Sequence, residues 1–420
     1  MDVNAFLKLI EERQDEMFQI LREMINIDSQ SFLDGTGKEE PMARHLEKVY
    51  KEMGLEPDVF SPLDVGIESH PDYLPGRHLE NRYNCAAVVP GSKHDHRILL
   101  TGHEDTVTIG DPELWKFDPF GGEIIDGNMC GRGVGDDKFG IAIPIFIMKL
   151  MKEQGIQLPY DVVLAGYSDE ENGGSNGALA LNLKYPCDEA LNLDGSRMEI
   201  ICGGAGVGVV KVTLESDEIC DSCANVAAAY DIFREEMAAW GKERGAEFAV
   251  RDLFKNTDIP NTTVRYTDIR AGWDGSAMGR LETLITIYTI HDEATTRAQW
   301  AEVEKRVNER CKDLKVHVKG WEMMTRFFHF VETDPQSKGV KLLQESIKAA
   351  CGREHKPMGM CLSDFPMFTL YGCKDAITFG CGRHFDMEGG AHQFNEFVEC
   401  EWLVDFAKTI AYFLLTYKFD

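Results

Sequence analysis

Residues 97–107 read RILLTGHEDTV, and this stretch decides the fold class. Its apolar run is short and ends in a polar segment, which predicts a buried strand. Runs of the same kind occur at residues 86–90 (AAVVP), 160–167 (YDVVLAGY) and 189–195 (EALNLDG). Residues 141–151 are apolar on nearly every side, as in a helix that packs on a sheet. We therefore expect an α/β fold, a mainly parallel sheet flanked by helices, with functional residues at the strand ends.

The segments around this core predict two domains, which a length of 420 residues favours. Apolar residues at helical spacing predict helices over residues 4–26 and 42–53. From about residue 204 to 318 the pattern is strand, helix, two strands, helix and strand, which predicts a small α+β domain. The last hundred residues return to two helices around a short strand. We assign one domain to residues 1–203 and 320–420, and an inserted domain to residues 204–319.

The composition excludes several classes of partner. A net charge of −27 would repel nucleic acid and anionic membrane surfaces. Residues 1–21 carry charges in every turn, so we expect no signal peptide, no membrane span and a cytoplasmic protein. The twelve cysteines show no framework of a small disulfide-rich domain, and we interpret them as reduced thiols.

The opening stretch and a glycine-rich segment further along the chain each contain candidate residues. His103 and Asp105 lie at i and i+2, where strand alternation would place both side chains on one face. Asp105 could then accept the second imidazole N–H and orient His103 as a metal ligand, although an ordinary hydrogen-bonded pair has the same pattern. Further on, residues 131–140 read GRGVGDDKFG, with Asp136 and Asp137 after three glycines. The Lys-Ser/Thr ending of a phosphate-binding loop is missing, so a metal-binding carboxylate is the preferred interpretation.

More acidic residues and a second histidine follow other predicted strands. Asp169, Glu170 and Glu171 come directly after one strand, Asp194 ends another, and His392 lies in GGAHQFNEF. Alone, the acidic triplet is more typical of an exposed turn, and a lone histidine such as His392 is more typical of a structural residue. Together, two imidazoles and several carboxylates at strand ends favour a site for two divalent metal ions. Zinc suits these ligands best, with cobalt or manganese as alternatives, and one carboxylate could bridge the two ions.

Five motifs carry a resemblance to a known family. They are GHEDTV, the segment LWKFDPFGGEIIDGNMCGRG, DEENGG, LDGS and AHQFNEF, and they span almost the whole chain. In their order and surroundings they resemble the zinc aminoacylase and peptidase family that includes acetylornithine deacetylase, succinyl-diaminopimelate desuccinylase and carboxypeptidase G. The resemblance implies that the inserted domain is a ferredoxin-like lid, and that a homodimer forms through it.

The resemblance also implies a role for each candidate residue. His103 and Asp194 would bind one metal ion and Glu171 and His392 the other, with Asp136 bridging both.

Asp105 would orient His103 without binding a metal ion itself, and Glu170 would be the general base. The implied activity is hydrolysis of the amide bond of an N-acyl amino acid or related small amide by a water that two metal ions activate. A dipeptidase or carboxypeptidase with the same centre is an alternative, and a non-catalytic ligand-binding protein is an alternative of another class.

The inserted domain departs from the family pattern. Relatives carry a histidine there that helps to bind the oxyanion, but this chain has none between His103 and His291. Ser276 stands where relatives have an asparagine. Cys220 and Cys223 form a Cys-x-x-Cys pair without a second pair, which is typical of incidental thiols. Three arginines could hold a substrate carboxylate, although arginines in solvent or in salt bridges are commoner; they are Arg270, Arg326 and Arg383.

Overall fold

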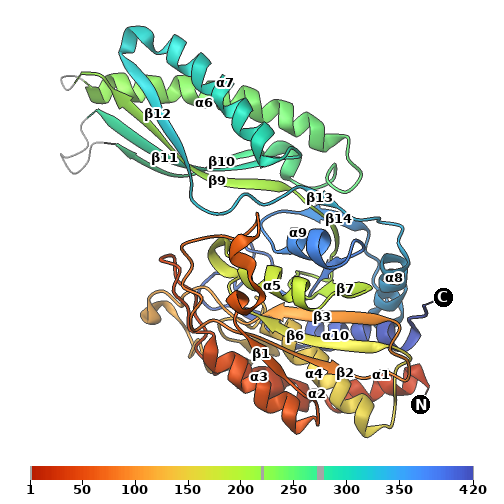
Figure 1. The fold of residues 1–420 in the computed structure, drawn as a ribbon. Coiled ribbons are helices and arrows are strands. Elements are labelled where there is room, and N and C mark those ends of the chain that lie inside the picture. The colour runs from red at the N-terminus through yellow and green to blue at the C-terminus, as the bar shows by residue number, and fades with distance from the viewer. Residues whose placement is uncertain (1, 219–221, 272–278, 420) are drawn as a thin grey trace. The chain divides into compact units, whose positions relative to one another are not determined.

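The computed structural model describes residues 2–218, 222–271 and 279–419. The chain divides into two compact units. Unit 1 comprises Met1–Cys202, Thr333–Pro357 and Met367–Asp420, and unit 2 comprises Gly203–Glu332 and Met358–Pro366. The predicted fold class is confirmed, since one sheet has a parallel centre flanked by helices and a separate small sheet is antiparallel (Figure 1).

The large sheet is parallel only at its centre. Strands β6, β3, β7 and β15 are parallel neighbours, and the strands outside them are antiparallel. The order is β1 (Asp58–Phe60), β2 (Asn84–Val89), β6 (Asp161–Tyr167), β3 (Arg97–His103), β7 (Glu189–Asn192), β15 (Ile377–Phe379), β8 (Ile200–Gly204) and β13 (Val331–Glu332). A three-stranded antiparallel sheet in unit 1 has the order β16 (Phe397–Glu399), β5 (Asn128–Cys130) and β4 (Glu123–Ile125).

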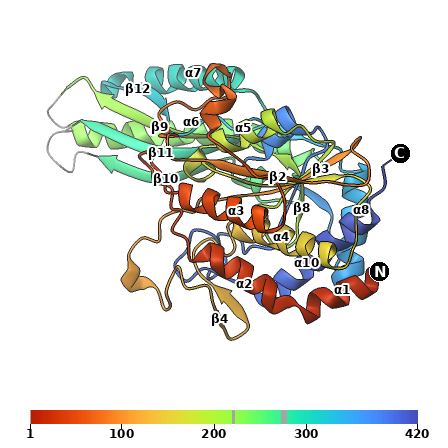
Figure 2. The same ribbon diagram turned by 60° about the horizontal axis from the view of Figure 1, so that its bottom comes forward.

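Helices cover both faces of the large sheet (Figures 1 and 2). The predicted apolar helix is α4, which packs on β3 and buries nearly all of its side chains because it lies between the sheet and α2. The helices of unit 1 are α1 (Val3–Glu12), α2 (Gln14–Ile25), α3 (Glu40–Glu52), α4 (Lys138–Glu153), α5 (Asn176–Lys184), α8 (Lys338–Cys351) and α10 (Cys400–Thr416). Short elements near the unit boundaries are β13 (Val331–Glu332), β14 (Pro357–Met360) and α9 (Phe365–Met367).

The prediction of one helix over residues 4–26 is wrong at its centre. The helical conformation breaks at Arg13, which has φ −110° and ψ 16°. The guanidinium of Arg13 binds Glu16 at the start of α2 and, at 3.2 Å, Glu153 at the end of α4. These contacts accompany the break between α1 and α2, and apolar spacing alone does not reveal them.

Unit 2 has the element order strand, helix, two strands, helix and strand. Its sheet is antiparallel in the order β10-β11-β9-β12, and α6 and α7 lie on one face of it (Figure 1). The elements are β9 (Gly206–Ser216), α6 (Ser222–Ala249), β10 (Val264–Ala271), β11 (Arg280–Thr289), α7 (Glu293–Arg310) and β12 (Val316–Met323). The core between helices and sheet includes Phe233, Trp240 and Trp300. In the described part of the chain, no helix has both the length and the apolar character of a membrane span.

Candidate metal centre

Several of the candidate residues lie at or just after the ends of neighbouring parallel strands of unit 1. Strand β3 lies between β6 and β7, and the register pairs His103 with Tyr167 at the end of β6. The pairing with β7 extends to Asn192. Because the carboxyl ends of parallel strands lie at one edge of a sheet, the residues after β6 and β7 reach His103. Glu170 and Asp194 are among them.

A glycine-rich loop before α4 carries Asp136. Gly133 has a φ of 83°, a left-handed conformation that glycine adopts without strain. Glu396 holds this loop, since its carboxylate accepts hydrogen bonds from the N–H groups of Gly133 (3.1 Å) and Gly135 (2.8 Å). It also forms an ion pair of 2.7 Å with Arg132. Glu396 therefore fixes the approach of Asp136 to the strand ends.

Asp136 lies between the two candidate histidines. Its Oδ1 is 2.9 Å from His103 Nε2, and its Oδ2 is 3.2 Å from His392 Nε2. His392 Nε2 is also 3.0 Å from Glu171 Oε2. The peptide bond between Asp136 and Asp137 is cis. The two oxygens of one carboxylate thus face two different imidazoles.

Among the described residues, the potential ligand atoms form three overlapping groups. Within each group they lie within 4.8 Å of one another: His103, Asp137 and Asp194; His103, Glu170 and Glu171; Asp136, Glu171 and His392. All five candidate ligands and Glu170 are therefore brought together.

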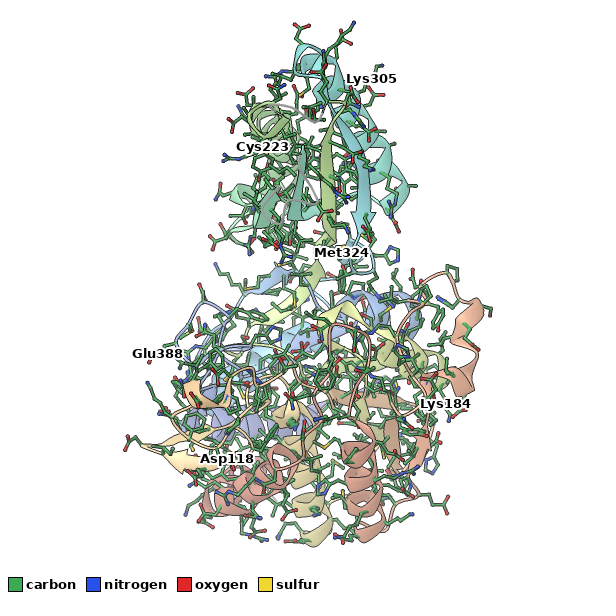
Figure 3. All side chains as sticks on the ribbon, turned by 90° about the vertical axis from the view of Figure 1, so that its left-hand side faces the viewer. Asp118, Lys184, Cys223, Lys305, Met324 and Glu388 are labelled. Atoms are coloured by element: carbon green, nitrogen blue, oxygen red, sulfur yellow. The ribbon has the colours of Figure 1, made fainter. Side chains whose placement is uncertain are left out.

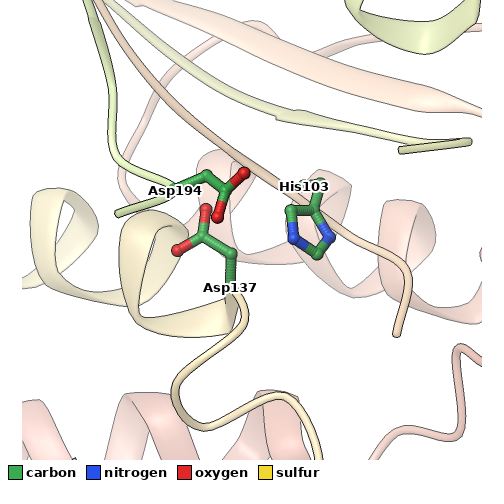
Figure 4. A group of neighbouring side chains, drawn as sticks. All are labelled: His103, Asp137 and Asp194. Carbon is green, nitrogen blue, oxygen red and sulfur yellow. The ribbon is translucent and has the colours of Figure 1, made fainter. Parts of the chain in front are cut away.

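Asp137, which was not among the candidate ligands, belongs to the first group (Figure 4). Its carboxylate is buried and has no hydrogen-bond partner among the described residues. Beside it, the carboxylate of Asp194 approaches from the other side of the group (Figure 4). The structure therefore places an acidic pair next to His103 in addition to Asp136.

The buried carboxylates of the centre shift the pKa values of the residues around them. Burial, together with the charge of Asp136, raises the pKa of Asp194 to about 7. Burial also raises the pKa of Glu171. Burial opposes the charged form of His392, but Glu171 and Asp136 outweigh this and raise its pKa to about 11. Imidazole nitrogens and carboxylate oxygens in such a cluster fit divalent cations, which would neutralise it without protons.

Asp105 is fully buried behind the centre, and its contacts differ from those expected. The nearest group to His103 Nδ1 is the backbone carbonyl of Asp105 at 2.8 Å, whereas the Asp105 carboxylate is 3.7 Å away. The carboxylate accepts instead from the N–H groups of Glu170 (3.1 Å) and Glu171 (3.0 Å). The reason is that β3 ends at His103, so strand alternation does not extend to Asp105.

The sequence analysis did not predict the charged residues that lie behind Asp105. Arg82 is fully buried and forms ion pairs with Glu39, Asp105 and Asp169. Arg77, also from the segment before β2, pairs with Asp169. These residues belong to no motif and show no periodicity, so the sequence contains no local signal for them.

Two residues singled out in the inserted domain, Cys220 and Ser276, lie outside the described residues. Cys223 is exposed near the start of α6 (Figure 3). Arg270 and Arg383 each form an ion pair with a carboxylate of the chain.

Residues 99–416 match the model of peptidase family M20/M25/M40. The chain belongs to this family. The predicted resemblance and the predicted class of metal-dependent hydrolase are confirmed at this level.

The relatives of the chain have different activities. An N-formyl-4-amino-5-aminomethyl-2-methylpyrimidine deformylase of Bacillus subtilis (strain 168) is 27% identical over 200 residues. This match covers 47% of the chain but only 43% of the deformylase, less than half of its length. An uncharacterized metallohydrolase of Methanocaldococcus jannaschii is 24% identical over 341 residues, 75% of this chain and 79% of that protein. The structure of the di-peptidase Dug1p from Saccharomyces cerevisiae has the same fold, with a TM-score of 0.73 over 98% of both chains at 15% identity.

Replacement of Glu396 by alanine tests the support of the Asp136 loop. We expect Glu396→Ala to lower the free energy of unfolding by about 3–5 kcal/mol, because Arg132 is left as an uncompensated buried charge. Chemical denaturation followed by circular dichroism measures this change. Glu388→Ala is the control, since Glu388 is exposed (Figure 3). An equal effect of the two substitutions would contradict the role of Glu396.

Proposed function

We propose that this chain is a two-metal hydrolase that cleaves the amide bond of an N-acyl amino acid or a related small amide. The position of Glu170 carries the proposal. A carboxylate oxygen of Glu170 lies within 4.8 Å of the ligand atoms of His103 and Glu171. A carboxylate beside such a centre can take a proton from an attacking water.

The contacts of Asp136 support its role as the bridging ligand. Because its two oxygens face His103 and His392 separately, each oxygen can bind a different ion. We assign His103 and Asp194 to one ion and Glu171 and His392 to the other, as the resemblance implies. The mixture of nitrogen and oxygen ligands suits zinc, with cobalt or manganese as substitutes.

A hydrogen bond from the backbone orients the carboxylate of Glu171. Glu171 Oε1 accepts a hydrogen bond of 2.9 Å from the N–H of Val107, while its Oε2 faces His392. This division leaves one oxygen directed at the centre and holds the other. A backbone contact of its own chain thus orients Glu171.

The ions and the residues around them would have separate roles in hydrolysis. Two divalent ions bound here would polarise the amide carbonyl and lower the pKa of the attacking water. Glu170 removes the proton of that water and returns it to the departing nitrogen. The backbone N–H of Glu170 donates to Asp105 Oδ1 at 3.1 Å, which fixes the segment that carries the base.

We also infer that residues 1–203 and 320–420 form the catalytic domain and that residues 204–319 form a lid and dimerisation domain. Strand β10 is an edge of the unit 2 sheet, and its outer backbone groups can pair with a second copy of the chain. Light scattering should therefore report twice the mass of one chain, and the mass of a single chain would contradict the dimer.

Substitution of Glu170 tests the assignment of the base. We expect Glu170→Gln to lower kcat by about 10²–10⁴-fold, because proton transfer is lost while the shape of the side chain is kept. The content of bound metal should not change. Glu113→Gln, at an exposed carboxylate of the same unit, is the matched control. Full activity of the Glu170 variant would refute its role.

The same assay, run on two substrate panels, separates the amide hydrolase from the dipeptidase. N-acetyl and N-formyl amino acids form one panel, and dipeptides with a free amino group form the other. Preference for the first supports the proposal, and preference for the second favours a dipeptidase. Turnover of neither panel by protein with two bound ions would contradict both and favour a non-catalytic binding protein.

A further inference from the structure

Two buried arginines meet at one carboxylate behind the proposed base. Arg77 and Arg82 each approach Asp169 Oδ1 to 2.7 Å. The side chain of Arg77 is 7% exposed, and those of Arg82 and Asp169 are fully buried. We call these three residues the arginine clamp. It joins the segment before β2 to the segment after β6.

The arginine clamp contacts the backbone of residues 169–175, the segment that carries Glu170 and Glu171. Arg77 Nη2 donates to the backbone carbonyl of Glu171 at 3.1 Å. Arg82 Nη2 lies 3.5 Å from Asp105 Oδ2, and the Asp105 carboxylate accepts from the N–H groups of Glu170 and Glu171. The amide group and the carbonyl group of Glu171 are thus both held by charged side chains.

The conformation of this segment explains why it needs such support. Asp169, Asn172 and Ser175 have φ angles of 62°, 61° and 61°. Left-handed conformations are disfavoured for residues other than glycine and persist where the surrounding structure holds them. Three of them within seven residues mean that the segment does not keep this shape by its own preference. The contacts of the clamp supply the restraint at its start.

Stability alone is a weak explanation for the clamp. Buried ion pairs often add little net stability, because the loss of hydration offsets the attraction between the charges. The clamp also has a geometric feature that a stabilising pair does not need, since the hydrogen bond from Arg77 Nη2 ends on the backbone carbonyl of Glu171. Contacts of this kind fix the direction of a side chain that binds a metal ion.

We propose that Arg77 and Arg82 are positioning residues, which act through Asp169 and Asp105 to aim Glu170 as the base and Glu171 as a metal ligand. This inference rests on the proposed function. It predicts that a change at Arg77 alters the metal centre although Arg77 is not itself a ligand.

Cobalt binding tests the proposal without any substrate. The full-length protein is stripped of metal with a chelator and titrated with Co²⁺, whose visible absorption reports ligand geometry. We expect Arg77→Met to weaken Co²⁺ binding by about 10–100-fold and to change the spectrum, as loss of an outer partner of a metal ligand does. Arg77→Lys keeps the charge and should recover part of the affinity.

The matched control is Arg353→Met. Arg353 is partly buried in unit 1, where it pairs with Asp405 at 3.2 Å and lies 3.7 Å from the ring centroid of Trp402, both on α10. A general loss of stability would affect both methionine variants, whereas a positioning role affects Arg77 alone. We expect the control to bind Co²⁺ like the unaltered chain.

The outcomes are distinct. If the unaltered chain binds no Co²⁺, the proposed function fails and the clamp's role fails with it. If it binds two ions and Arg77→Met binds them with the same affinity and spectrum, the proposed function stands and the clamp's role is refuted. If Arg77→Met does not fold, Arg77→Lys decides, and affinity and spectrum equal to those of the unaltered chain would overturn the inference.

Discussion

The parallel pairing of β3 with β6 and β7 is the constraint on which the candidate centre depends. These strands are separated in sequence by up to about ninety residues, yet their pairing places the residues that follow them at one edge of the sheet. His103 ends the central strand of the three. A shift of one residue in either register would turn the acidic residues away from it.

The buried carboxylates require positively charged partners. These partners differ on the two sides of the Glu170–Glu171 segment. Behind the segment, Arg77 and Arg82 pair with Asp169, Asp105 and Glu39. At the centre itself, the positive partners are the imidazoles of His103 and His392. Burial raises the pKa of Asp194 and of Glu171. This imbalance is the physical basis for assigning metal ions to the centre.

The strands, α4 and the candidate ligands could be predicted because their signals are local. An apolar run that ends near an acid or a histidine predicts a strand, as at His103 and Asp194, and the whole set of such residues suggested the metal ligands. Arg82 could not be found in this way, because its carboxylate partners lie 23 to 87 residues away and none belongs to its own element. The orientation of Asp105 was also beyond reach, since it depends on the end of β3 at His103. Helical spacing likewise gave no sign of the break at Arg13.

Anomalous diffraction from crystals of the zinc-loaded protein, at the zinc absorption edge, tests the two-metal centre most directly. We expect two peaks about 3.5–4 Å apart, the usual separation in two-metal hydrolytic sites, with one oxygen of Asp136 bound to each ion. Ligation by His103 and Asp194 at one ion and by Glu171 and His392 at the other should accompany them. A single peak, or two ions bridged by Asp137 in place of Asp136, would contradict this expectation.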